Sequence, residues 1–133
     1  ILDINKKGVF FVEQFAAIIL TKIMSPFDSY YVDQMSPAGI GIGALVYNYN
    51  GKVYASDESR MLAEMNDETF CLGHLDDGYK NVILSDKLLS PLEESFTGSA
   101  PMCSDCVYES YCGADPVFHY ATQNDFVGHK PSS

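Results

Sequence analysis

The sequence contains no tryptophan, one arginine (Arg60) and only 8 basic residues against 18 acidic ones. Proteins that bind nucleic acid do so mainly through Lys and Arg side chains that neutralise phosphates. The formal net charge of −10 therefore excludes an ordinary nucleic-acid-binding protein, and it disfavours an anionic membrane surface for the same reason. We expect the acidic residues to form a solvated surface, with recognition of a basic partner or peptide as the alternative.

No apolar run in the sequence is long enough for a transmembrane helix. The longest stretch, residues 8–24 (GVFFVEQFAAIILTKIM), is interrupted by Glu13, Gln14 and Lys22 and falls short of the ~20 apolar residues that a membrane span needs. No signal peptide is evident among the first residues. We expect a protein of a reducing compartment, the cytoplasm, where clustered thiols bind metal rather than form disulfides.

The sequence also lacks the common motifs of nucleophilic and nucleotide chemistry. It has no G-x-S-x-G, no H-E-x-x-H and no phosphate-binding glycine loop, and the segment GIGIG (39–43) lacks the spacing of a dinucleotide site. The chain begins without methionine and ends soon after its cysteine cluster. We therefore expect a piece of a longer protein, with catalysis in a part outside these 133 residues.

The spacing of apolar residues predicts two clear elements. Apolar side chains at helical intervals predict an amphipathic helix over Val9–Met24, ended by Ser25-Pro26. Alternation in GALVYNYNGKVYASD (43–57) predicts a β-hairpin with a tight turn at Asn50-Gly51. Short helices are predicted by their capping signals: 58–65 behind Asp57, one or two within LSDKLLSPLEESF (84–96) with a start at Ser90-Pro91, and one from Asp115-Pro116 to 124.

The cysteines carry the strongest chemical signal. Three of the four lie within CSDCVYESYC, as Cys103, Cys106 and Cys112, and a C-x-x-C turn directs two thiolates toward one centre. Thiolates suit zinc or the irons of an iron–sulfur cluster, and Gly113 lets the backbone pass close to a bulky group. The local spacing leaves zinc, an iron–sulfur cluster and metal-free thiols open, and a thioredoxin-type redox pair is disfavoured because no βαβ pattern surrounds it.

Other side chains are weaker candidates for the same site. The sequence has three histidines, and His119 or His129 could complete a metal site with nitrogen, whereas His74 lies far upstream. We interpret each histidine as an ordinary packing or surface residue. Cys71 lies in an apolar extended segment, TFCLGHL (69–75), and we interpret it as a small buried side chain.

The hairpin and the cysteine cluster together resemble a known family. The segments YNYNGKVYASD, FCLGHL and CSDCVYESYCG resemble the SPASM domain, the auxiliary-cluster extension of radical S-adenosylmethionine (radical SAM) enzymes that modify peptides. LTKIMSPF, SPAGIGIGALVYNYNGKVYASDESRMLAEM and YCGADPV are similar to the radical SAM maturases of His-Xaa-Ser peptide systems. The resemblance covers nearly the whole chain.

The resemblance implies a fold and a domain organisation. The fold class is α+β: a small β-hairpin with several short helices and long loops around a cysteine-ligated metal site (SPASM/twitch-like), preceded by one amphipathic helix. Residues 1–38 would be a linking helix and connector from an upstream radical SAM barrel. Residues 39–133 would be a SPASM-like auxiliary-cluster domain that continues beyond Ser133.

The resemblance also implies cofactors, partners and an activity. Cys103, Cys106 and Cys112 would hold one 4Fe–4S cluster, with a fourth ligand beyond Ser133. A second auxiliary cluster would be missing, because Ser56 and Pro116 stand where the family has cysteines. S-adenosylmethionine would bind only in the upstream barrel, so that this chain alone would be inactive and would serve electron transfer or positioning of the substrate peptide.

Two other interpretations remain open. In the first, a zinc ion held by the same three cysteines and by a histidine or Cys71 stabilises an interaction module without a redox role. In the second, the chain is a metal-free scaffold whose hairpin binds a peptide by strand addition.

Overall fold

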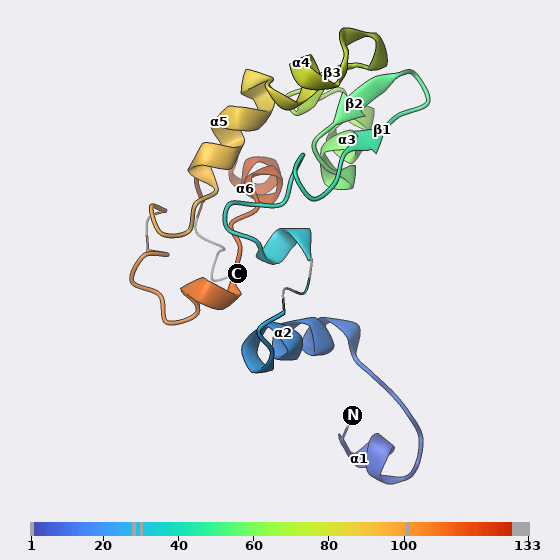
Figure 1. Ribbon diagram of the computed structural model, residues 1–133, viewed down its shortest axis with the longest axis vertical. Helices are drawn as coiled ribbons and strands as arrows, with labels where there is room; N and C mark the ends of the chain where they lie inside the picture. Colours follow the sequence, from blue (N-terminus) through green and yellow to red (C-terminus); the bar gives the residue numbers. More distant parts are fainter. Residues whose placement is uncertain (1, 28, 30, 101, 129–133) are drawn as a thin grey trace. The chain divides into compact units, whose positions relative to one another are not determined.

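The computed structural model describes residues 2–27, 29, 31–100 and 102–128. Its chain divides into two compact units, Ile1–Tyr31 and Val32–Ser133 (Figure 1). The roles that the resemblance gives to residues 1–38 and 39–133 stay predictions.

The first unit contains two helices, α1 (Leu2–Lys6) and α2 (Gln14–Met24). Carboxylate oxygens of Glu13 accept the N–H groups of Phe15 and Ala16, at 3.1 and 2.6 Å, and thereby fix the start of α2. The predicted start at Val9 was wrong. The apolar spacing continues back to Val9, but the Glu13 cap makes Gln14 the first residue of the helix. The predicted end at Ser25 is confirmed.

The described helices are all too short or too polar to cross a lipid bilayer.

The second unit contains a three-stranded antiparallel sheet in the order β1-β2-β3. Strands β1 (Val46–Tyr47) and β2 (Lys52–Tyr54) form the predicted hairpin, with Tyr47 opposite Val53. The extended segment around Cys71 is the third strand, β3 (Cys71–His74), which pairs with β2. The predicted α+β class is therefore confirmed, while the finer SPASM-like arrangement stays a prediction.

The hairpin turn is longer than predicted. Strands β1 and β2 are joined by residues 48–51, closed by the Gly51 N–H, which donates to the Asn48 carbonyl at 3.0 Å. Gly51 has a φ of 82°, which favours glycine, whereas Asn50 takes an ordinary negative φ. A four-residue loop needs one such residue, so the predicted two-residue Asn-Gly turn was wrong in type but right in place.

The last helix of the second unit begins where the sequence predicts, whereas two earlier helices begin at other residues than predicted. They are η1 (Val32–Gln34), α3 (Asp57–Glu64), η2 (Leu75–Asp77), α4 (Tyr79–Ile83), α5 (Asp86–Glu94), η3 (Glu109–Tyr111) and α6 (Pro116–Gln123). Helix α6 begins as predicted: Asp115 caps it and Pro116 is its first residue.

Two predicted helix starts were wrong. Helix α3 is capped by Ser56 rather than Asp57, since Ser56 and Ser59 exchange backbone and hydroxyl hydrogen bonds at 3.2 and 2.8 Å. Helix α5 begins at Asp86 and contains Pro91 in its interior. It continues through the proline because Leu88 and Leu92 are buried on one face, and their burial outweighs one missing hydrogen bond.

The core lies between the sheet and helices α3, α5 and α6 (Figure 1). Phe70 is 1% exposed and its ring makes edge contacts with Tyr120 and Phe126, each with centroids 5.5 Å apart. These contacts join the segment before β3 to α6 and to the chain after it. The core thus fixes α6, which carries one wall of the site described next.

Candidate metal centre

The cysteine segment is built from successive tight turns with a repeat of three residues. The N–H groups of Cys103, Cys106, Glu109 and Cys112 each donate to the carbonyl three residues earlier, at 3.0–3.2 Å. Side chains three residues apart lie on the same side of such a backbone. The turns bring the three cysteines and Glu109 close together in space, and the Glu109 side chain extends toward Thr97.

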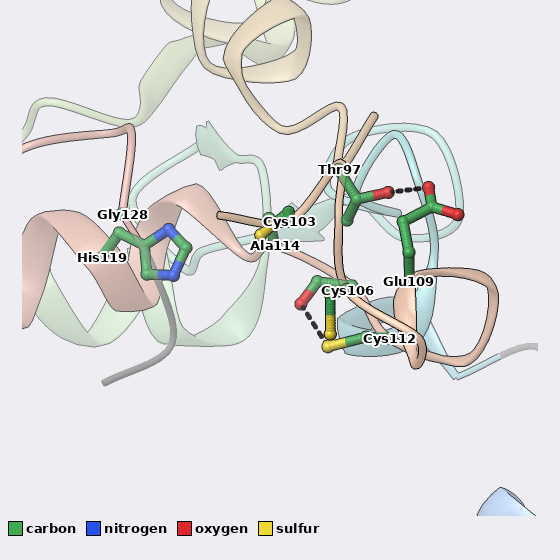
Figure 2. A pocket seen from close by; sticks show the side chains of 9 residues that line it. Thr97, Cys103, Cys106, Glu109, Cys112, Ala114, His119 and Gly128 are labelled. Carbon is green, nitrogen blue, oxygen red and sulfur yellow. Dashed lines mark hydrogen bonds between the residues drawn. The ribbon is translucent and has the colours of Figure 1, made fainter. Parts of the chain in front are cut away.

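These four side chains line one cavity of about 60 Å³ (Figure 2). The rest of its wall consists of Thr97, Gly113, Ala114, His119 and Gly128. Cys103 and Cys112 are half-buried, Cys106 is exposed, and none of the cysteines forms a disulfide. The structure thus brings the three predicted metal ligands to one place, and metal binding itself stays a prediction.

The cavity wall carries several side chains that can bind metal, but they are not arranged around a single ion. Within the described part of the chain, no three His, Cys, Asp or Glu side chains are arranged to hold one metal ion. Tetrahedral zinc–sulfur bonds of ~2.3 Å would draw the sulfur atoms to within about 3.8 Å of one another. A single ion therefore requires the thiols to move closer together.

Burial and charge repulsion oppose ionisation of the Cys103 thiol at the cavity. Burial raises the pKa of the Cys103 thiol, and the neighbouring Cys112, Cys106 and Glu109 side chains raise that pKa further by charge repulsion. Thiolates can share this space only if a cation offsets their repulsion, as a metal centre does.

Glu109 anchors the cysteine segment to the rest of the unit. Its Oε1 accepts a 2.6 Å hydrogen bond from the hydroxyl of Thr97, which is 1% exposed. Thr97 is held in turn by Ser36, whose Oγ accepts the Thr97 N–H at 3.0 Å. Glu109 was not predicted from the sequence, although its position three residues from both Cys106 and Cys112 is a signal that points to it.

His119 enters the cavity wall from α6. The side chain of Asp115 caps this helix by accepting the N–H groups of Val117 and Phe118, at 3.0 and 3.2 Å. The cap places His119 in the first turns of the helix, where it is 1% exposed. Figure 2 shows its imidazole extending from α6 toward the side of the cavity where Cys103 lies.

The remaining candidates lie away from this cavity or outside the described residues. Cys71 is half-buried in β3, with its thiol 3.8 Å from the carbonyl of Gly73. His74 is at the hairpin end, with Nε2 3.2 Å from the Asn50 carbonyl. His129 lies outside the described residues. Ser56 and Pro116, at the two positions where the resemblance would place cysteines, are the cap of α3 and the first residue of α6.

Comparisons with protein-family models, with curated proteins and with solved structures find no match to this chain.

Proposed function

We propose that this chain is the auxiliary-cluster part of a radical SAM enzyme that modifies a ribosomal peptide. Cys103, Cys106 and Cys112 would hold one 4Fe–4S cluster. The observation that carries the proposal is the cavity that all three thiols line together. The sequence resemblance to SPASM domains supports it independently. In this proposal S-adenosylmethionine binds in an upstream barrel, and the partners of the chain are that barrel and the substrate peptide.

The donor set of the cavity fits such a cluster. When bound, a 4Fe–4S cluster supplies one-electron transfer, and each of its irons takes a separate ligand. Ligands on separate irons stand farther apart than ligands on one ion. Among the described residues no three such donors are arranged around one ion, and a cluster does not require that arrangement.

A zinc-stabilised interaction module is the second candidate. One observation favours it: His119 lines the same cavity as the three cysteines, and three cysteines with one histidine are a common structural zinc set. In that case the thiols would close around one ion, and the chain would have no redox role.

Anaerobic reconstitution of cysteine variants tests the proposal. The wild-type chain is incubated with iron and sulfide, and the brown charge-transfer absorbance is compared with that of Cys106→Ser and Cys71→Ser. Cys106→Ser should lose the absorbance, because it removes a ligand from the cavity. Cys71→Ser should retain it, because Cys71 lies in β3, outside the cavity wall.

The two variants give a matched comparison of one substitution at two places. Equal absorbance in both variants would contradict the assignment of the cluster to this cavity. A wild-type chain that stays colourless and takes up stoichiometric zinc would contradict the cluster itself and favour the zinc module.

A further inference from the structure

We propose that His119 is the fourth protein ligand of the metal centre, an inference that rests on the proposed function. The sequence resemblance places this ligand beyond Ser133, whereas the structure offers a donor within the chain. His119 lines the cavity with Cys103, Cys106 and Cys112 and is 1% exposed. Its imidazole extends toward the cavity from the wall formed by α6 (Figure 2).

Of the two titratable side chains besides cysteine that line the cavity, His119 and Glu109, His119 suits this role better. Glu109 also lines the wall, but its Oε1 is engaged by the Thr97 hydroxyl at 2.6 Å. That bond holds the carboxylate against the loop before the cysteines. Imidazole nitrogen also suits iron in sulfur-rich sites better than a carboxylate oxygen does.

The backbone at Gly128 packs against the imidazole of His119. A Cβ built on Gly128 would lie 2.6 Å from Cγ of His119 and 2.9 Å from its Cδ2. Only glycine lets the chain after α6 approach the ring this closely. The ring is thus confined between this segment and the cavity, which preorganises it for a ligand on the cavity side.

A cluster does not require its ligands to converge on one ion. Because each ligand of a 4Fe–4S cluster binds its own iron, the imidazole does not have to touch the thiols. A nitrogen ligand in place of a fourth thiolate reduces the negative charge on the cluster and raises its reduction potential.

The experiment is pulsed EPR on the reduced cluster of the 133-residue chain, with histidine labelled by either ¹⁴N or ¹⁵N. The assignment predicts a strong nitrogen coupling that changes with the isotope, remains in His74→Ala and His129→Ala, and disappears in His119→Cys. It also predicts a lower reduction potential for His119→Cys. A merely structural histidine would give neither result. If His119→Cys fails to fold, a histidine coupling in the unmodified chain that remains in both His74→Ala and His129→Ala still assigns the ligand to His119.

The outcomes separate the two proposals. A cluster without histidine coupling, or with coupling that persists in His119→Cys, overturns the ligand assignment and leaves the proposed function standing. A chain that binds zinc and no sulfide overturns the proposed function. The cobalt-substituted form then decides on His119 alone: visible bands that shift in His119→Ala but not in His74→Ala support the assignment, and unchanged bands overturn it.

Discussion

The hydroxyl of Thr97 donates a 2.6 Å hydrogen bond to Oε1 of Glu109, which lies midway between Cys106 and Cys112. Thr97 precedes Cys103 in the sequence, so this one bond closes the loop that carries Cys103 and Cys106. The loop has few other anchors among the described contacts that hold it to the body of the unit. The arrangement of the cavity therefore depends on a buried hydroxyl that binds no metal.

Replacement of Thr97 by valine should destabilise the unit. The variant keeps the shape of the side chain but removes the hydroxyl bonds to Glu109 and Ser36, so the free energy of unfolding should fall by ~1–3 kcal/mol, while the bond from the N–H of residue 97 to Ser36 is kept. Urea unfolding followed by circular dichroism measures this change. Ser99→Ala is the control, since the Ser99 hydroxyl is exposed and donates only to the nearby Phe96 carbonyl; an equal loss in both variants would contradict the anchoring role.

Asp67 and Thr69 should make stability depend on pH in the acid range. The Thr69 hydroxyl and N–H donate to Oδ1 of Asp67 at 2.7 and 3.0 Å, and the hydroxyl bond is the main cause that lowers the pKa of Asp67 below its ordinary 3.8. Since the folded-state pKa is the lower one, this stabilisation is fully present above the unfolded value. It is lost as the pH falls through the folded value.

Comparison of the wild-type chain with Thr69→Val tests this linkage. At neutral pH the variant should be less stable by about 1 kcal/mol, because it loses the hydroxyl bonds to Asp67 and Tyr120. The difference between the two proteins should narrow as the pH drops below 3.8. A difference that stays constant over this range would show that the charge of Asp67 does not contribute.

Gly128 should be intolerant of even the smallest side chain. In Gly128→Ala the new methyl group would overlap the His119 ring, so the ring or the backbone must shift, at a cost of ~1–3 kcal/mol in unfolding free energy. Gly98→Ala is the matched control, because no atom lies within 4 Å of the Cβ built there. Thermal unfolding of both variants checks this, and a Gly128→Ala variant as stable as Gly98→Ala would contradict the close packing on His119.

The cap of α3 distinguishes the structure from the sequence prediction. Ser56→Ala should lower the free energy of unfolding by ~1 kcal/mol, because it removes the acceptor for the Ser59 N–H. Asp57→Ala removes only the exposed pairing with Arg60 and a favourable charge in the first turn, and it should cost less than about 0.5 kcal/mol. A larger loss of unfolding free energy in Asp57→Ala than in Ser56→Ala, measured by denaturant titration, would show that Asp57 is the cap.

The sequence predicted those parts of the fold that depend on local chemistry. The hairpin followed from alternation around Gly51, and the start of α6 followed from Asp115-Pro116, because caps and turns act within a few residues. The start of α5 was missed because the burial of Leu88 and Leu92 decides it, and burial depends on the whole unit. The start of α3 was missed because Ser56 and Asp57 are both good caps, and only the Ser59 hydroxyl decides between them.

The candidate site was likewise predicted where it depends on local sequence and missed where it depends on packing. The cysteine spacing pointed to Cys103, Cys106 and Cys112, and the repeat of three residues that places them also contains Glu109. His119 could not be assigned to their cavity from spacing. Its place there depends on how α6 packs through Tyr120 against Phe70, a contact between residues far apart in the sequence.

The metal and acid-labile sulfide content of the anaerobically reconstituted chain tests the cluster assignment most directly. A 4Fe–4S cluster on Cys103, Cys106 and Cys112 predicts about four iron and four sulfide per chain, with both lost in Cys106→Ser. Stoichiometric zinc with no sulfide, before and after reconstitution, would contradict it.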